Sequence, residues 1–324
     1  MLDFYTNKRI LISGGNGYIA TNLVEVLKVV DCNIIRLCRS AERKSPILGE
    51  ARACIETTFG NIRHPDVWLN LVRNVDVIFH LAAQTSLYVA NRDPIADYQS
   101  NVLPMLYLLE ACRHQQCTPT VVFASTVTIV GPTNQIPVNE TCPNKPITMY
   151  DTHKLMAELY LNYYTHQKIV QGTSLRLANV YGPGRKSSSN DRGILNIMIR
   201  KGLSGEPLTI YGTGENVRDY VYIADIVRAF LMAATNIEQL AGRYFVIGHG
   251  KGHTITESFR LIAERIEQKK DIPVIVKHVI PPSPQHLIEK RNFVADSSAF
   301  KQATGWNSHW SLVEGIDRTI EAYT

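Results

Sequence analysis

Short apolar runs alternate along this chain with longer segments in which apolar and polar residues recur at helical spacing. The apolar runs predict strands, and most of these strands are of the kind that is buried on both faces of a sheet. They are expected at Arg9–Ile12, 33–38, 53–59, 76–81, 120–125 and 173–177. The amphipathic segments predict helices, of which the clearest are expected over about 95–113 and 150–167.

Strands and helices that alternate in this way predict an α/β fold with right-handed crossovers and a doubly wound parallel sheet, a Rossmann domain. We expect this dinucleotide-binding domain over residues 1–180, with later segments near 220–248 returning to it. Residues 181–324 are expected to form mainly a smaller substrate-binding part over the carboxyl ends of the strands, where ligands bind in such sheets. Further elements are predicted at 208–211, 220–222, 223–234, 243–247, 256–269 and 273–280.

Composition and charge narrow the classes of function. Of 324 residues, 45% are apolar and 19% charged, which is an ordinary balance for a globular protein with a substantial core. The net charge of +5 is scattered, so nucleic acid is not an expected partner. No apolar stretch approaches the roughly 20 residues that a membrane span needs, and no signal peptide is recognised, so we expect a cytoplasmic protein. The six cysteines form no C-x-x-C pair, which predicts reduced thiols and no metal site.

A glycine-rich turn follows the first predicted strand. Gly14, Gly17 and Ala20 have the spacing G-x-x-G-x-x-A at the start of an amphipathic segment. Glycines allow a sharp turn and a bare backbone, so that the amide groups of a helix N-terminus can approach a pyrophosphate. The alternative is a glycine-rich turn that only ends a strand, and the strand–turn–helix context favours the dinucleotide site.

Tyr150 and Lys154 form the second candidate constellation. Their i, i+4 spacing places both side chains on one face of a predicted helix, and Ser125 and Thr126 end the strand before it. A tyrosine with a pKa near 10 acts as a base at neutral pH only if its phenolate is stabilised, by about 4 kcal/mol for three pKa units. A nearby lysine ammonium supplies much of that stabilisation, and a hydroxyl group can hold the substrate oxygen. The alternative is an exposed pair that happens to have this spacing.

With these motifs in order, the sequence resembles the extended short-chain dehydrogenase/reductase family, specifically its nucleotide-sugar epimerases and dehydratases. The resemblance extends over nearly the whole chain. It rests on 13–20, 60–62, 80–83, Pro94, Tyr98, Asn101, 123–131, Tyr150, Lys154, 175–183, 211–215, 218–222 and 305–306.

The resemblance implies a role for each matching residue. Thr126 would hold the sugar hydroxyl, Tyr150 would act as acid and base, and Lys154 would lower the pKa of the tyrosine and hold the nicotinamide ribose. NAD or NADP would be bound by Gly14, Asn16, Gly17, Tyr18, Ile19, Asn61, Ile62, Leu81, Ala82, Ala83 and Asn101, together with Tyr150 and Lys154. A nucleotide-diphosphate sugar would be bound by Thr128, Asn179 and Arg218.

Two segments of this sequence differ from the family pattern, and the first of them helps to distinguish a dehydratase from other members of the family. Dehydratases of this family carry an Asp-Glu pair directly after the catalytic threonine, and Val127 and Thr128 stand there, so dehydration is not expected. The segment 285–288 lacks the usual nucleotide-binding pattern, and Lys290 or Arg291 is the expected replacement.

The end of the second predicted strand bears on the choice of cofactor. The acidic residue that binds the ribose hydroxyls of NAD is replaced by Cys38, which is followed by Arg39 and Ser40. An arginine there can pair with a 2′-phosphate, which favours NADP. The alternative is a surface arginine beside NAD, and the sequence leaves the choice open.

Three functions are consistent with these residues. The first is epimerisation of a nucleotide-activated hexose, at C4, through a transient 4-keto sugar. The second is an NADPH-dependent 4-ketoreductase of an NDP-4-keto-deoxyhexose, and the third is a non-catalytic binding protein, which the intact Thr126, Tyr150 and Lys154 argue against. A homodimer is expected because the helices near 101–114 and 150–167 carry apolar residues on more than one face, and the resemblance implies the same pairing.

Overall fold

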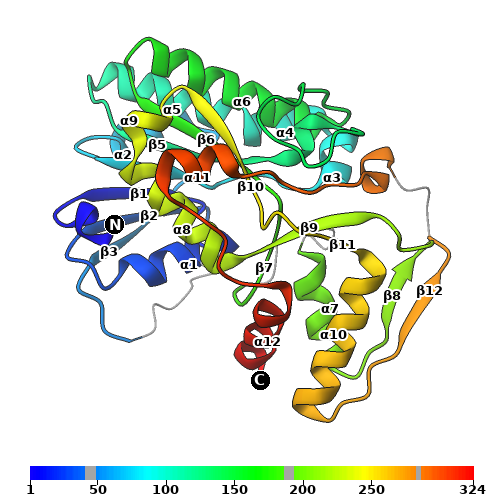
Figure 1. The fold of residues 1–324 in the computed structure, drawn as a ribbon. Coiled ribbons are helices and arrows are strands. Elements are labelled where there is room, and N and C mark those ends of the chain that lie inside the picture. Colours follow the sequence, from blue (N-terminus) through cyan, green and yellow to red (C-terminus); the bar gives the residue numbers. More distant parts are fainter. Residues whose placement is uncertain (41–48, 186–192, 282–285) are drawn as a thin grey trace.

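The computed structural model describes residues 1–40, 49–185, 193–281 and 286–324 (Figure 1). A seven-stranded sheet forms its centre, in the order β10-β6-β5-β4-β1-β2-β3, and every neighbouring pair of strands is parallel. Its strands are β1 Arg9–Ser13, β2 Asn33–Cys38, β3 Cys54–Phe59, β4 Val77–His80, β5 Thr120–Thr126, β6 Gln171–Leu177 and β10 Arg243–Ile247. The predicted α/β fold with a doubly wound parallel sheet is confirmed.

Alternate residues of each strand point to opposite faces of the sheet and join different cores. On β1, Ile10 and Ile12 belong to the core beneath α1 (Tyr18–Leu27) and α8 (Ile223–Thr235). Leu11, between them, belongs to the second core. That core is covered by α2 (Pro65–Leu71), α5 (Leu103–His114) and α6 (Met149–His166). Helices therefore cover both faces of the sheet. The direction in which successive strands are added reverses between β1 and β4, and a crevice for a ligand is expected at that point.

The single helix predicted over about 95–113 is wrong. The structure has two helices there, α4 (Pro94–Asn101) and α5, which are separated at Val102. Pro104 has no N–H to donate to the carbonyl of Ser100, and its ring crowds that carbonyl, so one helix cannot continue through this segment. Proline is well tolerated in the first turn of a helix, which is where Pro104 lies in α5.

A second, smaller lobe lies beyond the carboxyl ends of the strands, at the lower right of Figure 1. It contains a three-stranded sheet of β7 (Asn179–Tyr181), β9 (Val217–Tyr222) and β11 (Gly252–Thr254), and a pair formed by β8 (Leu208–Tyr211) and β12 (Val276–Val279). The helices α7 (Ile194–Leu203), α10 (Ile255–Lys270) and α12 (Leu312–Tyr323) pack around these strands.

Several short elements connect these parts. They are η1 Leu2–Tyr5, α3 Leu87–Arg92, η3 Val127–Val130, α9 Ile237–Leu240, η4 Leu287–Lys290 and α11 Ser298–Thr304. Of the segments near 220–248, β10 lies in the large sheet, whereas β9 pairs with β7 and β11. The division of the chain into a domain over 1–180 and a part over 181–324 stays a prediction.

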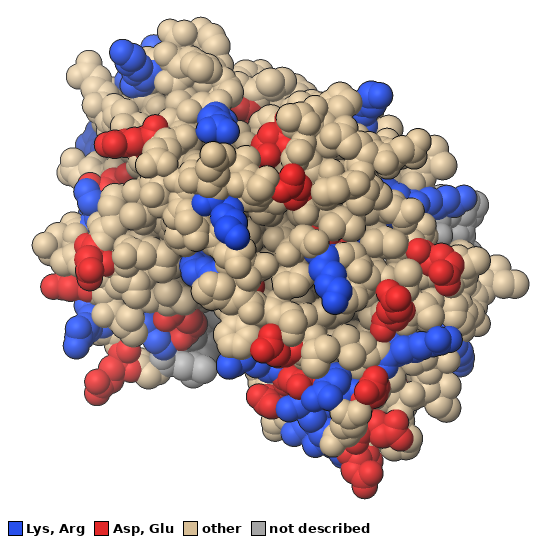
Figure 2. Space-filling model, in the orientation of Figure 1, with Lys and Arg blue, Asp and Glu red and all other residues tan. Residues whose placement is uncertain are grey.

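Charged side chains of both signs are mixed over the visible face of the molecule. Figure 2 shows Lys and Arg next to Asp and Glu, and on that face neither sign forms a continuous patch. At the outer end of the smaller lobe the charges are paired, since Arg265 contacts Asp317 and Lys269 contacts Glu321. Across the described residues, no helix combines the length and the apolar character that a bilayer crossing requires.

Candidate active site

The glycine turn joins β1 to α1, and a Cβ on any of its three glycines would lie 2.8–2.9 Å from another atom. Gly14 has φ +70°, and a Cβ there would lie 2.9 Å from both the N and the Cα of Ala82. A Cβ on Gly17 would lie 2.9 Å from the carbonyl oxygen of Gly14, to which the Gly17 N–H donates at 2.6 Å. The turn thus packs directly against the segment after β4 and leaves the start of α1 as bare backbone. The fit supports the predicted pyrophosphate site.

Ser13 fixes the segment after β4 against this turn. Its Oγ accepts the N–H groups of Leu81 and Ala82, each at 3.1 Å, and lies 2.9 Å from Nδ1 of His80. Burial, with a smaller contribution from Lys154, lowers the pKa of His80 to about 3, so the ring is neutral and accepts the serine proton at Nδ1. Leu81, Ala82 and Ala83 are therefore held beside Gly14, as the predicted cofactor site requires. The sequence reading did not assign this role to Ser13 or His80.

The end of β2 lies against the same turn. Cys38 is buried there, Arg39 is exposed and Ser40 is partly exposed, so no carboxylate ends the strand. Arg36, two residues earlier, is buried and donates from Nη2 to the oxygen of Gly15 at 3.1 Å and to Oδ1 of Asn16 at 2.9 Å. Arg185 adds a contact from Nη1 to the oxygen of Asn16 at 3.4 Å.

Sequence analysis missed Arg36, although an arginine inside the otherwise apolar run 34–38 was the available signal. It contributes positive charge beside the glycine turn.

Other predicted cofactor residues lie around this turn and have partners within the chain. The Tyr18 hydroxyl donates to the oxygen of Gly182 at 2.9 Å, so its side chain turns toward the 182–184 loop, and Ile19 follows it on the first turn of α1. After β3, Oδ1 of Asn61 accepts the N–H of Arg63 at 3.1 Å, and the oxygen of Ile62 accepts Nε1 of Trp68 at 2.9 Å.

The predicted catalytic residues come from the end of β5 and the first turns of α6, which pack together. Thr126 is the last residue of β5, Tyr150 the second residue of α6, and Lys154 lies one turn further, and all three are buried. Lys154 is only 3% exposed, and its Nζ lies 4.1 Å from the ring centre of Phe123. Burial lowers its pKa to about 7, against the opposing effect of two carboxylates, Glu158 and Asp97.

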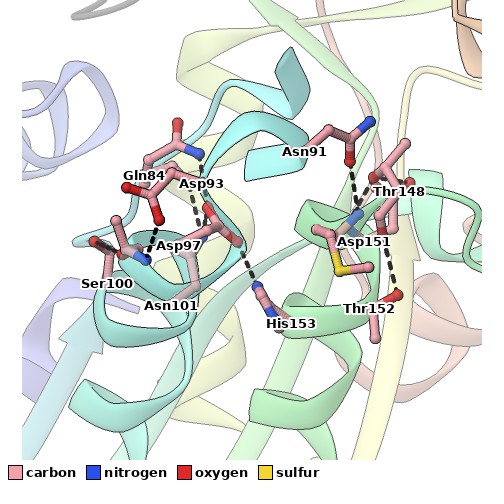
Figure 3. Close-up of polar contacts among 12 residues, drawn as sticks. Gln84, Asn91, Asp93, Asp97, Ser100, Asn101, Thr148, Asp151, Thr152 and His153 are labelled. Atoms are coloured by element: carbon pink, nitrogen blue, oxygen red, sulfur yellow. Dashed lines mark hydrogen bonds and ion pairs between the residues drawn. The ribbon is translucent and has the colours of Figure 1, made fainter. Parts of the chain in front are cut away.

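Both carboxylates near Lys154 already have a basic partner. Asp97 on α4 accepts from Nδ1 of His153 at 2.6 Å, which joins α4 to α6 (Figure 3). Glu158 binds Arg176 of β6 in a bidentate pair, with Nε to Oε1 at 2.9 Å and Nη2 to Oε2 at 2.6 Å. Lys154 is therefore buried beside the ring of Phe123, and the two carboxylates that favour its charged form are each shared with another basic side chain.

Asn101, at the end of α4, presents an open hydrogen-bond acceptor. Its Nδ2 donates to Oδ1 of Asp97 at 2.9 Å and to the oxygen of Gln84 at 3.0 Å, which uses both of its protons (Figure 3). Its Oδ1 is buried and has no hydrogen-bond partner among the described residues. A buried acceptor without a donor is unfavourable, so this oxygen fits a donor from a bound molecule or water.

A third carboxylate, which sequence reasoning missed, is connected through Thr128 to Thr126, the predicted catalytic threonine. Asp151 accepts the hydroxyl of Thr128 at Oδ1 and the hydroxyl of Thr148 at Oδ2, the second at 2.6 Å. Oγ1 of Thr128 in turn lies 2.8 Å from Oγ1 of Thr126. Positions 127 and 128 carry no acidic residue. The fold nevertheless brings the carboxylate of Asp151, from α6, to the hydroxyl group of Thr128.

The predicted substrate residues of the smaller lobe lie on β7 and β9. Asn179 is partly buried, and Arg218 is buried and donates to the backbone oxygens of Val217 at 3.1 Å, Glu289 at 2.5 Å and Arg291. Arg218 therefore holds the η4 segment over this lobe, and its contact with a nucleotide stays a prediction. Lys290 is exposed, and residues 282–285, which include part of the departing segment, lie outside the described residues.

All six cysteines are free thiols. In the part of the chain that the structure describes, no three His, Cys, Asp or Glu side chains gather in a way that could hold a metal ion.

Comparison with known proteins identifies the family of this chain. The chain is 29% identical over 318 residues to UDP-glucose 4-epimerase of Mycolicibacterium smegmatis, with 97% of this chain and 98% of that protein covered. It superposes on the crystal structure of UDP-glucose 4-epimerase of Thermotoga maritima with UDP-glucose at a TM-score of 0.85, with 30% identity, over 97% of this chain and 98% of that one.

A second solved structure contains a cofactor. UDP-glucose 4-epimerase of Thermus thermophilus, in complex with NAD, matches at a TM-score of 0.83 and 29% identity, over 97% of this chain and 98% of that one. The family model described as "NAD dependent epimerase/dehydratase family" matches residues 10–248, well over half of the 324 residues. This protein is a member of the NAD-dependent epimerase/dehydratase family, and its cofactor is NAD or NADP.

Proposed function

We propose that this protein is a nucleotide-sugar epimerase that inverts C4 of an NDP-hexose through a transient 4-keto sugar. The observation that carries the proposal is that Thr126, Tyr150 and Lys154 are all buried at the end of β5 and the start of α6, at the same edge of the sheet as the glycine turn after β1. The absence of an acidic pair at positions 127 and 128 speaks against dehydration. Similarity to proteins named UDP-glucose 4-epimerase supports the same reaction.

Each of the three residues has a distinct task in this proposal. Tyr150 takes the proton from the sugar hydroxyl and later returns it, and Thr126 binds the same oxygen. Lys154 stabilises the phenolate, since an ammonium within a few ångströms favours the charged form of a neighbouring acid. Burial gives that ammonium a stronger field than it would have in water, although burial also lowers the pKa of Lys154 to about 7.

A bound NAD or NADP would supply hydride-transfer chemistry at the reacting carbon of the sugar. Gly14, Asn16 and Gly17 would hold its pyrophosphate at the start of α1. The turn formed by Leu81, Ala82 and Ala83 and the open Oδ1 of Asn101 would line the same crevice.

The second candidate is a 4-ketoreductase that consumes NADPH. The observation that favours it is the end of β2, where Cys38 replaces the acidic residue and the exposed Arg39 follows. A reductase exchanges its cofactor in every cycle, so it benefits from selecting NADPH through a 2′-phosphate contact. A charge-assisted pair with Arg39 would contribute roughly 1.5–3 kcal/mol, which is about ten- to a hundredfold in preference for NADP.

One experiment separates the two functions. The purified protein is incubated with UDP-glucose without added NADPH, and separately with a UDP-4-keto-6-deoxy sugar plus NADPH. The epimerase proposal expects isomerisation in the first assay and little effect of Arg39→Ala. If activity appears only in the second assay, and Arg39→Ala raises the KM for NADPH at least tenfold, the epimerase proposal is wrong and the protein is a ketoreductase. Arg52→Ala, an exposed arginine before β3, is the control and should leave both assays unchanged.

We also propose that the protein is a homodimer. The two helices on which this expectation rested differ: α5 has no large apolar side chain that is exposed, whereas Leu159 and Tyr163, one turn apart on α6, are 61% and 59% exposed. Ile95 of α4, which packs against α6, is 69% exposed. Large apolar side chains gathered on adjacent helices are the usual mark of a protein interface.

We expect a dimer mass by light scattering at micromolar concentration, and a shift to monomer in Leu159→Glu. Val313→Glu, which changes an exposed apolar residue on α12, should leave the dimer intact. A monomeric wild-type protein would rule out this interface.

A further inference from the structure

Asn16, in the glycine turn, has a side-chain amide whose orientation is set by its partner. Its Oδ1 accepts a hydrogen bond from Nη2 of Arg36 at 2.9 Å, and Arg36 is only 4% exposed. A guanidinium group has donors and no acceptor, so the amide atom that faces it must be the oxygen. The Nδ2 of Asn16 is then the open branch of the amide, and its two protons have no acceptor within hydrogen-bond distance among the described residues.

The acceptors around this amide already face guanidinium groups. The oxygen of Gly15 accepts from Nη2 of Arg36 at 3.1 Å and from its Nε at 3.4 Å. The backbone oxygen of Asn16 accepts from Nη1 of Arg185 at 3.4 Å. The N–H of Gly15 donates to the oxygen of Leu37 at 2.9 Å, which ties the turn to β2. The group that this part of the turn leaves open is therefore a donor.

The same groups lie at the end of β2. A Cβ on Gly15 would lie 2.8 Å from the Cβ of Arg36 and 3.1 Å from the Sγ of Cys38, so the turn packs directly on this strand. Burial raises the pKa of the Cys38 thiol. The guanidinium groups of Arg36 and Arg185 and the N–H of Asn16 oppose that rise, so positive charge and donors gather near Cys38. In this fold, the end of the second strand lies next to the adenosine ribose of a bound dinucleotide.

NAD and NADP make opposite demands on such a position. The ribose 2′-hydroxyl of NAD offers a proton, and its usual partner is a carboxylate at the end of the second strand, where this chain has Cys38. The 2′-phosphate of NADP carries negative charge and offers strong acceptor oxygens. A hydrogen bond between an N–H donor and an ionised acceptor is stronger than one between neutral groups. An open amide donor beside positive charge therefore suits the phosphate.

We propose that the side-chain amide of Asn16 binds the 2′-phosphate of NADP, and that Arg36 is a positioning residue that holds this amide in its donating orientation. The inference goes beyond the proposed function, because it concerns the cofactor and applies whichever reaction the protein catalyses. The 2′-phosphate takes no part in hydride transfer, so NADP serves an epimerase that retains its cofactor as well as a reductase that exchanges it. Unlike the exposed Arg39, Asn16 is held in place by the fold before the cofactor binds.

Two fragments of the cofactor test the inference without any sugar or nicotinamide. Adenosine 2′,5′-bisphosphate and 5′-AMP differ only in the 2′-phosphate, and both are titrated calorimetrically into protein freed of its cofactor. We expect the bisphosphate to bind at least tenfold more tightly. Asn16→Asp keeps the size of the side chain and an oxygen for Arg36, but it replaces the donor with a charged acceptor. In that variant the preference should disappear or reverse.

Two further variants separate positioning from a general effect on the fold. Arg36→Met removes the donors that hold Oδ1 of Asn16, so the amide can rotate, and the preference for the bisphosphate should fall below about threefold. A variant that only loosens the turn would weaken both fragments alike and leave their ratio unchanged, which would reject the positioning role of Arg36. Asn33→Asp adds the same charge at the exposed start of β2 and should keep the tenfold preference. If Arg36→Met does not fold, Asn16→Asp still decides whether the amide binds the phosphate.

The cofactor released from the purified protein by denaturation and identified by mass spectrometry gives an independent readout, and we expect NADP. Release of NAD alone, equal affinities of the two fragments for the wild-type protein, or a preference that Asn16→Asp leaves unchanged would overturn the inference. None of these results decides the proposed function, which isomerisation of UDP-glucose tests. A preference that Asn16→Asp removes, in a protein that does not isomerise UDP-glucose, would support the inference and reject the epimerase.

Discussion

Tyr150→Phe is expected to reduce turnover of the nucleotide sugar to at most a few per cent of the wild-type rate, while the protein still binds its cofactor. The phenylalanine ring keeps the packing of Tyr150 against Leu87, Ala90 and Ile288, but the oxygen that exchanges a proton with the sugar is lost. Acid–base groups of this kind contribute about 10²- to 10⁴-fold to a rate. The rate is measured by product formation and the cofactor by its absorbance in the purified protein.

A matched change on the same helix serves as the control. Tyr160→Phe removes a phenol oxygen from a partly buried position three turns along α6, away from the first turn, and should keep most of the activity. Retention of more than a few per cent of activity by Tyr150→Phe would remove this tyrosine from the proposed mechanism. Loss of the cofactor in Tyr150→Phe would instead show that the ring is needed for binding.

Glu158→Gln is expected to destabilise the fold by about 3–5 kcal/mol, because it removes one partner of a buried ion pair. Arg176, which is fully enclosed, donates to Glu158 through two nitrogens, and its guanidinium lies 3.6 Å from the ring centre of Tyr244. Without the carboxylate, a buried guanidinium loses its compensating charge. The free energy of unfolding is measured by urea denaturation of wild-type and variant protein.

An exposed ion pair provides the comparison. Glu25→Gln breaks the contact with Lys28 on the surface of α1, and we expect a change within about 1 kcal/mol because water screens such pairs. Similar losses of stability in Glu158→Gln and Glu25→Gln would contradict the claim that burial sets the difference.

Glu158 also favours the charged form of Lys154, so removal of its charge should lower the pKa of that lysine further.

Local patterns predicted most of the large sheet. The runs 33–38 and 243–247 coincide with β2 and β10, because an apolar run between turn residues is a local property of the chain. The segment 95–113 was predicted as one helix because its apolar residues continue through Val102. The structure has two helices there, because Pro104 lacks the N–H that a continuous helix would need at that position. The short strands β7 and β11 were not predicted, because three residues are too few to show an alternation of apolar and polar positions.

The sequence by itself determined the fold class, the family and the core of the candidate site. A glycine turn with G-x-x-G-x-x-A spacing and a Tyr150–Lys154 pair one turn apart are local arrangements, so they can be read without knowledge of the rest of the chain.

Only the tertiary structure decided which groups surround that core. His80 lies 67 residues from Ser13, His153 lies 56 from Asp97, and Asp151 lies 23 from Thr128. These pairs meet because strands β1 and β4 are neighbours and because α6 packs against α4 and η3. A hydrogen bond needs its two atoms within about 3 Å, and no pattern along the chain determines that approach. The lowered pKa of Lys154 follows from such packing, because burial is its main cause.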